Sequence, residues 1–236
     1  MSFQRARTEQ QKNARLTEIK QATIQLYNTI GFSDITLTRV ANDLSFSRVN
    51  LYKYYKTSEE IFLNILLDDL TLFSSDLKGK IDGKTNLPIL DFAEIFTDTI
   101  LKQRRMLHLL TLDLCIMEKK LAEDKLLAHK AATLSLMAEI AEEVTRCYPQ
   151  ISIDQSVDFI NSLNYYSRGL YAAVNLNASQ HKVLEELEAG HMVPDYKTAM
   201  AQFIVIHLGY YVNAQQEQGD LCLLRHLPQC LWIHKT

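Results

Sequence analysis

Helical periodicity, interrupted by few helix-breaking residues, is the feature that most constrains the fold of this chain. The 236 residues include only seven Gly and four Pro. Apolar residues recur at intervals of three and four, as on the buried side of an α-helix. The first such stretch runs from about Gln10 to Ile30. Gly31 is expected to end it in a left-handed conformation, with Phe32 as the contact beyond the cap. The sequence therefore predicts an all-α protein.

Two short helices joined by a tight turn are predicted next. Thr36 fits the N-cap of a helix over 37–44, and Ser47 fits the N-cap of another over 48–55. The intervening residues 45–47 are too few for anything but a turn. Two short helices joined in this way form a helix-turn-helix unit. With the first helix, they predict a three-helix N-terminal domain.

The remainder of the chain is predicted to be a larger helical domain. Thr57 and Glu60 have the spacing of a capping box, and the helix that follows is expected to reach about Leu77, before Gly79. Further helices are expected over about 86–102, 104–117, 121–147, 153–175 (capped by Ser152 with Gln155), a short stretch from Ser179 to Gly190, and 195–218. The tail from 219 to 236, with the single Trp232, is expected to pack on this body.

Charge is distributed unevenly between the two parts. Residues 1–56 carry nine Lys and Arg and four Asp and Glu, a net charge of +5. The other 180 residues carry 16 basic and 24 acidic side chains, a net charge of −8. A basic head on an acidic body indicates that the head alone meets a polyanion, although chance clustering is the alternative.

The predicted third helix carries side chains suited to nucleic acid. Arg, Lys and Asn are the residue types that contact base edges and phosphates. A helix that enters the major groove places its N-terminal residues against the bases, here Ser47 to Asn50. Leu51 and one or two of the tyrosines must pack inward to hold this helix. The polar and basic residues of the helix are Arg48, Asn50, Tyr52, Lys53 and Tyr54.

At this point the sequence resembles the TetR family of bacterial regulators over about residues 10–65. The matching features are Gly31-Phe32, Thr36, Val40-Ala41, Ser47, Leu51-Tyr52, Tyr54-Tyr55-Lys56 and Glu59-Glu60-Ile61-Phe62. Beyond them, only the number and lengths of the helices are similar. Ser45 departs from the Gly that is common in the family's turn, so a left-handed conformation there is expected to carry a cost.

The resemblance implies roles for individual residues. Thr36, Tyr54 and Lys56 would contact DNA phosphates, Thr36 through the helix N-terminus. Arg48 and its neighbours would face bases or phosphates, with Val49 against a thymine methyl. The predicted DNA-binding residues are Thr36, Thr38, Arg39, Ser47, Arg48, Val49, Asn50, Tyr52, Lys53, Tyr54 and Lys56. Residues 1–56 would then be the DNA-binding domain, and 57–236 the effector-binding and dimerisation domain.

The resemblance also implies a homodimer on double-stranded operator DNA. Its interface would use the two long helices at about 153–175 and 195–218, with the recognition helices one DNA turn apart, ~34–36 Å. Apolar stripes on these helices are equally consistent with the core of one subunit. They comprise Val157, Ile160, Tyr171, Val174, Phe203, Ile204, Leu208 and Tyr211.

An effector pocket is implied within the body. The interpretation is a repressor that a small apolar or amphipathic molecule releases from DNA, although the same residues would also serve as ordinary core. Asp113, in an apolar stretch, would pair with a cationic ligand or an internal Arg, or would lie on a solvated face or beside Arg104 or Arg105. The predicted lining is Phe92, Phe96, Met106, Leu109, Asp113, Met117, Met137, Phe159, Leu163, Tyr166 and Leu170.

Other classes of protein find little support. The chain lacks common catalytic motifs, and its one Glu-x-x-His, at Glu188 and His191, is a single copy where a di-iron bundle needs two. We therefore expect no enzyme, no metal and no cofactor. The four Cys show no metal or disulfide spacing. With no signal segment and no bilayer-spanning run, we expect a cytoplasmic protein. A helical adaptor or carrier without DNA binding is the alternative.

Overall fold

The computed structural model describes residues 9–213, and within this range all regular secondary structure is helical, with ten α-helices and no strand. This confirms the predicted all-α fold. The N-terminal unit contains α1 (Glu9–Ile30), α2 (Leu37–Asn42) and α3 (Arg48–Leu51). The body contains α4 (Ser58–Ile81), α5 (Ile89–Leu101), α6 (Arg104–Leu112), a π-helical turn (Asp113–Met117), a 3-10 turn (Glu118–Lys120), α7 (Glu123–Cys147), α8 (Ile153–Val174), α9 (Ala178–Glu186), a 3-10 turn (Gly190–Met192) and α10 (Tyr196–Asn213).

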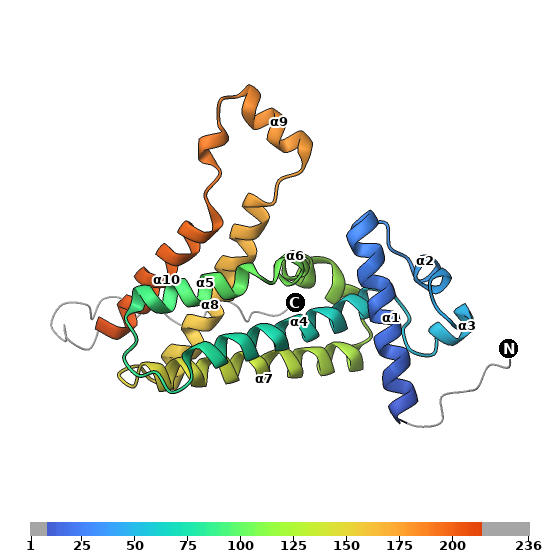
Figure 1. Ribbon diagram of the computed structural model, residues 1–236, viewed down its shortest axis with the longest axis horizontal. Helices are drawn as coiled ribbons and strands as arrows, with labels where there is room; N and C mark the ends of the chain where they lie inside the picture. The colour runs from blue at the N-terminus through green and yellow to red at the C-terminus, as the bar shows by residue number, and fades with distance from the viewer. Residues whose placement is uncertain (1–8, 214–236) are drawn as a thin grey trace, which may run out of the picture.

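The first three helices form a head at one end of the molecule (Figure 1). Ile19, Val40 and Leu51 are fully buried at its centre. Gly31 ends α1 with a φ of +76° and donates its N–H to the Tyr27 carbonyl oxygen, which confirms the predicted cap. The apolar faces of three helices therefore meet in one small core.

Contacts from α1 hold the head against the body. The Lys20 ammonium pairs with the Asp68 carboxylate of α4. Phe32, just beyond α1, lies against Phe62 of α4, with 4.7 Å between ring centroids. Because α4 begins directly after the head, it belongs to both units. The division at residues 56 and 57 therefore remains a prediction.

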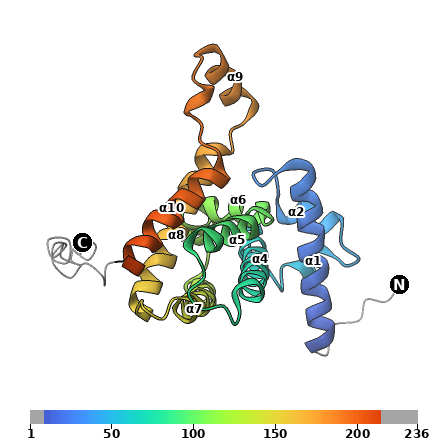
Figure 2. The same ribbon diagram turned by 60° about the vertical axis from the view of Figure 1, so that its left-hand side comes forward.

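The body is a bundle in which α4 packs on α5, α6 and α7, and α8 packs on α6, α7 and α10 (Figures 1 and 2). The rings of Phe92, Tyr148 and Phe159, from three different segments, meet at its centre. All three side chains are at most 1% exposed. This aromatic cluster joins α5, α8 and the end of α7 in one core.

Residues 175–195 leave the body as an arm that carries α9 (Figures 1 and 2). The helix begins at Ala178, and its N-cap is Asn177 rather than the expected Ser179, because Asn177 and Gln180 form a reciprocal capping box. It ends at Glu186, before the expected Gly190, and Glu188 has a left-handed φ of 53°. Local capping, which the sequence pattern places only approximately, sets both ends.

Other helix boundaries also differ from the predicted ones. α3 ends at Leu51 rather than at residue 55, because Lys53 and Tyr54 form tighter three-residue hydrogen bonds. α5 begins at Ile89, directly after Pro88, rather than at residue 86. α2 ends at Asn42 because Asp43 and Leu44 form tighter three-residue hydrogen bonds. α4 passes through Gly79 and continues to Ile81, which is 2% exposed, because burial of this last turn outweighs the ~1 kcal/mol cost of Gly.

The expected continuous helix over 104–117 is interrupted after Leu112. The Arg168 guanidinium of α8 donates to the Leu110 carbonyl oxygen at 2.8 Å. The Glu118 N–H then bonds to the Asp113 oxygen across a wider π-helical turn. A side chain from α8 thus changes the path of α6.

The described residues end at 213. They therefore leave out the last part of the helix expected to reach 218, and all of the tail with Cys222, Cys230 and Trp232.

Candidate nucleic-acid interface and effector cleft

The start of α2 matches the predicted cap. Thr36 has an extended conformation, and its hydroxyl oxygen accepts a hydrogen bond from the Arg39 N–H at 3.3 Å. The Arg39 guanidinium donates to the Asp34 carbonyl oxygen at 2.6 Å. Thr36, Thr38 and Arg39 are all exposed at this edge of the head.

The start of α3 differs in detail from the predicted cap. Ser47 is the N-cap residue, but among the described residues its hydroxyl makes no cap hydrogen bond to the helix backbone. It accepts instead from the Asn50 side-chain amide at 3.0 Å. The Lys53 ammonium in turn donates to the Asn50 side-chain oxygen at 2.6 Å. These three residues therefore form a continuous polar row along one side of α3.

A second polar pair lies beside this row. The Arg48 guanidinium donates to the Tyr52 hydroxyl at 2.9 Å and lies 5.5 Å from the centre of its ring. The side chain of Val49, the residue after Arg48, is 72% exposed. Single exposed apolar side chains are common on protein surfaces, so this exposure shows only that Val49 is accessible to a partner.

Inward-facing residues hold α3 in place. Leu51 is fully buried and Tyr55 is 5% exposed, which confirms that Leu51 and at least one tyrosine anchor the helix. Tyr54 is half-buried against Phe46. Lys56 is exposed, and its ammonium donates to the Tyr52 carbonyl oxygen at 2.8 Å. The predicted contact residues thus separate into an anchored side and an outward side.

The turn between α2 and α3 depends on residues that the sequence analysis did not single out. The Ser45 N–H donates to the Glu18 carboxylate at 2.7 Å, and the Arg15 guanidinium donates to the Ser45 hydroxyl at 2.8 Å. Ser45 does not have a positive φ, so the expected cost of a left-handed residue there is absent and that expectation was wrong. Since Glu18 and Ser45 are 27 positions apart in the sequence, no local pattern reveals this contact.

The same contact affects the ionisation of Glu18. Partial burial raises the pKa of its carboxyl, but the hydrogen bonds from Ser45 and the charge of Arg15 outweigh burial and hold the pKa below its ordinary value.

The cap at the start of α4 also differs from the predicted one. Thr57 accepts from the Glu60 N–H, but the Glu60 carboxylate accepts from the Lys56 N–H, so the predicted capping box is only half formed.

An apolar cleft lies among five helices of the body. Its cavity volume is about 50 Å³, so the cleft is narrow, within a wider space of about 540 Å³ that includes open solvent. Only three of its lining residues are polar, namely Thr133, Asn164 and Ser167. The apolar lining comprises Leu70 and Phe73 of α4, Phe96 and Ile100 of α5, Met106 and Leu110 of α6, Leu136, Met137 and Ile140 of α7, and Ile160 and Leu163 of α8.

The cleft brings together four of the predicted pocket residues, Phe96, Met106, Met137 and Leu163. The others lie elsewhere: Phe92, Leu109, Met117, Phe159 and Leu170 are buried in the core, Tyr166 stacks on Phe203, and Asp113 lies in an ion-pair cluster. Helical periodicity identifies apolar side chains, but it does not distinguish those that line a cleft from those that fill the core.

Asp113 pairs inside the body with Arg168, at 3.3 Å, and is only 2% exposed. Neither of the expected arginines is its partner, since Arg105 makes two hydrogen bonds to Asp69. Burial raises the pKa of the Asp113 carboxyl, but His129, Arg168 and Lys130 outweigh this effect and lower it. The internal-Arg alternative is therefore the one observed.

The helices expected at a dimer interface contribute both core and surface. Ile160, Ile204 and Leu208 are buried within the protomer, whereas Val157 is 38% exposed. Tyr171, Val174, Phe203 and Tyr211 are half-buried. The apolar side chains that α8 and α10 leave exposed are Ile153, Val157, Tyr165, Ile206 and Tyr210.

Glu188 and His191 lie exposed on the arm. Cys115 and Cys147, the two described cysteines, are free thiols. Among residues 9–213, no helix combines the length and apolar composition that a bilayer crossing requires.

Comparisons with known proteins extend these observations. The profile of a family described as "tetracyclin repressor-like, C-terminal domain" matches residues 67–209, more than half of the chain. Among solved structures, the chain is similar to the fatty acid degradation regulator FadR from Bacillus halodurans, with a TM-score of 0.53 and 11% identity over 83% of this chain and 95% of that one. At this identity the likeness concerns the fold alone. No match was found among curated proteins.

Proposed function

The chain belongs to the tetracyclin repressor-like family, and from that premise we propose that it is a dimeric repressor that binds operator DNA through its head and is released by a small apolar or amphipathic effector. Family membership indicates a ligand-responsive transcription regulator. The finer points, namely repression, the contact residues and the class of effector, constitute the proposal.

The outward side of α3 is the observation that carries the proposal. It presents Arg48, Val49, Asn50 and Lys53 from a helix that Leu51 anchors in the core. A guanidinium such as that of Arg48 recognises the edge of guanine, and an amide such as that of Asn50 recognises the edge of adenine. The two exposed methyl groups of Val49 are suited to contact with a thymine methyl. Among the polar side chains, hydrogen bonds link Arg48 to Tyr52, and Asn50 to Ser47 and Lys53.

A dimer would supply the second half of the DNA contact. The exposed apolar residues of α8 and α10 form a surface that a second copy of the chain would cover, as an isologous interface. Such a dimer would set the two α3 helices about one DNA turn apart. The residues we expect at its centre are Tyr165, Ile206 and Tyr210, which complement the stripe predicted from sequence.

The apolar lining of the cleft supports a hydrocarbon effector. Its three polar residues, Thr133, Asn164 and Ser167, would orient one polar group, while the rest of the surface would contact an apolar chain. The structural neighbour is named as a regulator of fatty acid degradation, which agrees with an effector of this kind.

DNA binding is tested with fluorescently labelled DNA from the region flanking the chain's own gene. We expect Arg48→Ala to weaken binding by about 1–3 kcal/mol, the usual value of a bidentate base contact. Lys182→Ala, which removes an exposed cation from α9, is the matched control and should leave affinity unchanged. Salt-independent retention, or none at any salt concentration, would favour an adaptor or carrier over a repressor.

The effector is tested separately by filling the cleft. Leu136→Trp adds bulk inside it, while Leu134→Trp adds the same group to the exposed side of the same helix, where Leu134 is 62% exposed. Medium- and long-chain fatty acids should raise the melting temperature of the wild type and of Leu134→Trp, and should lower their DNA affinity. The Leu136→Trp variant should respond to neither. If no apolar compound shifts stability or DNA binding, this part of the proposal is wrong.

A further inference from the structure

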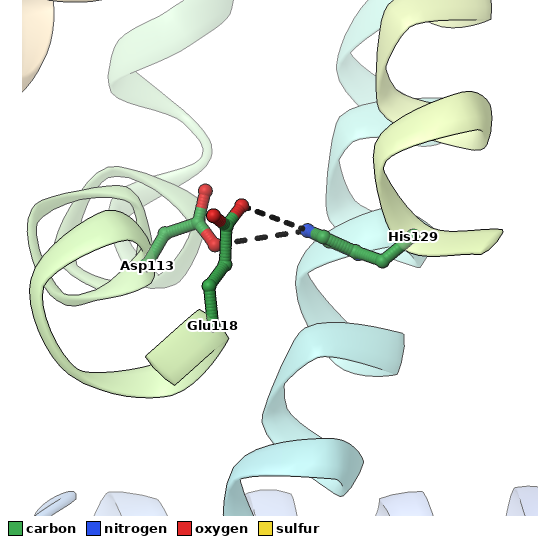
Figure 3. Close-up of side chains that lie close together, drawn as sticks. All are labelled: Asp113, Glu118 and His129. Atoms are coloured by element: carbon green, nitrogen blue, oxygen red, sulfur yellow. Dashed lines mark ion pairs between the residues drawn. The ribbon is translucent and has the colours of Figure 1, made fainter. Parts of the chain in front are cut away.

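Two buried side chains, Asp113 and His129, and the partly buried Glu118 converge where the head meets the body. Asp113 and Glu118 lie on the π-helical and 3-10 turns after α6, and His129 points toward them from α7 (Figure 3). Their ligand atoms, the Asp113 Oδ1, the Glu118 Oε1 and the His129 Nε2, all lie within 4.8 Å of one another. Asp113 is 2% exposed and His129 is 7% exposed.

The surrounding protein satisfies these atoms only in part, since the Lys130 ammonium lies 2.6 Å from the Glu118 Oε1 as an ion pair. Within the described part of the chain, none of the three has a partner with hydrogen-bond geometry. Buried polar atoms almost always have such a partner, so the Asp113 Oδ1 and the His129 Nε2, which lie together without one, require an explanation. The Nε2 of His129 lies 3.6 Å from Asp113 Oδ1 and 4.0 Å from Glu118 Oε1, too far for a hydrogen bond.

From this arrangement we infer that Asp113, Glu118 and His129 form a binding site for a divalent first-row transition-metal ion such as Zn²⁺. One imidazole and two carboxylates are suitable ligands for such ions. Ligands about 2.0–2.2 Å from a tetrahedral ion lie roughly 3.4 Å apart, so the two carboxylate oxygens, 3.6 and 4.0 Å from the His129 Nε2, need to approach it by less than about 1 Å. Three protein ligands leave a coordination position open for water.

The backbone explains why the two carboxylates meet. The Glu118 N–H bonds to the Asp113 carbonyl oxygen across the π-helical turn, which brings residues five apart in sequence to the same side. π-Helical turns are frequent at functional sites. Arg168 occupies only the Asp113 Oδ2 and leaves Oδ1 directed at His129.

A lysine is the competitor for this site. The Lys130 ammonium lies 2.6 Å from Glu118 Oε1, and its side chain is 41% exposed. With Arg168, it balances the charge of the two carboxylates when no ion is bound. Because the Lys130 side chain reaches solvent, it is able to turn away when a metal ion takes its place. Removal of the Lys130 ammonium should therefore tighten metal binding.

The site has a route to solvent. His129 also lines a hollow between α4 and α7 that Tyr54, Tyr55 and Lys125 border. The ion would therefore enter beside the end of the recognition unit. The inference does not rest on the proposed function, because the metal is detected by binding rather than by DNA affinity.

The test uses the full chain without an affinity tag, treated with chelator and then titrated with Zn²⁺ against a chromophoric competitor. Co²⁺ provides a second readout through its visible absorption. We expect one equivalent of tight binding per chain, weakened at least about tenfold by His129→Gln. Asp113→Asn should also weaken it, although loss of the Arg168 partner will lower the stability of that variant.

Lys130→Ala keeps the inference falsifiable, because this surface change is not expected to affect folding. It should tighten Zn²⁺ binding severalfold, while Lys125→Ala, an exposed lysine on the same helix, should not. A Cys222→Ser, Cys230→Ser variant removes the thiols of the tail and should retain the site. Equal Zn²⁺ binding by the wild type and His129→Gln, or loss of binding only on removal of the two thiols, would overturn the inference.

Discussion

The Glu18 carboxylate accepts a hydrogen bond from the Ser45 N–H at 2.7 Å, so the first helix directly holds the turn that sets the angle between α2 and α3. The recognition surface therefore depends on a residue that is not predicted to contact DNA. Arg15 adds a second bond to the Ser45 hydroxyl.

Replacing Glu18 should loosen this turn. We expect Glu18→Ala to lower the free energy of unfolding by about 1 kcal/mol, the usual value for such a bond at an accessible site, and to weaken DNA binding. Glu9→Ala, at an exposed position of the same helix, is the control. Urea unfolding measures the first effect. Equal stability of the two variants would show that the contact is dispensable.

The Glu18 contact should also depend on pH. Its pKa is lowered from 4.5 in the folded state, so the stabilisation is present above 4.5 and is lost as the pH falls through the folded-state pKa. The difference in melting temperature between the wild type and Glu18→Ala should therefore shrink on acidification below 4.5. A difference that stays constant or grows would contradict this assignment.

Lys53 is expected to neutralise a DNA phosphate or to contact a base. If it meets a phosphate, Lys53→Ala reduces the slope of log affinity against log salt by about 0.9. If it meets a base, affinity falls while the slope is nearly unchanged. Titrations at several salt concentrations separate these outcomes, with Lys182→Ala as the reference. No change in either quantity would remove Lys53 from the interface.

Ile206 is 73% exposed on α10 and tests the proposed dimer. Ile206→Asp would bury a charge in an apolar interface, a change that interfaces of this kind do not tolerate. We expect the variant to be a folded monomer by light scattering. Leu72→Asp, on α4 at 59% exposure, should remain dimeric. Should both variants dimerise, the interface lies on another surface.

His108 should make the protein less stable in mild acid. Burial lowers the pKa of its imidazole from 6.5, so below pH 6.5 the unfolded chain binds a proton that the folded chain rejects. Stability therefore falls as the pH decreases below this value. Burial also lowers the pKa of the His207 imidazole.

The measurement compares melting temperatures at about pH 7.5 and about pH 5.5. His108→Asn should reduce the loss of stability between them, and His181→Asn, at an exposed position, should not. Asn retains a polar group opposite the Tyr27 hydroxyl, which hydrogen-bonds to the His108 Nδ1. An unchanged pH dependence in His108→Asn would place the titrating group elsewhere.

The sequence by itself determined those features that depend on neighbours along the chain. The caps at Thr36 and Ser152 and the end of α1 at Gly31 involve residues no more than four positions apart, so their patterns are visible in the sequence. The same locality placed the helix-turn-helix unit and the outward residues of α3.

Only the tertiary structure decided which distant side chains meet. Periodicity places Ile160 and Ile204 on apolar faces of their helices, but it does not say what covers those faces. Only the tertiary structure shows that both side chains are buried in the core of the protomer. Arg168 lies 55 positions from Asp113, and its bond to the Leu110 oxygen breaks the helix that propensity alone would continue. Such contacts form because packing brings separate helices together, and no local pattern carries that information.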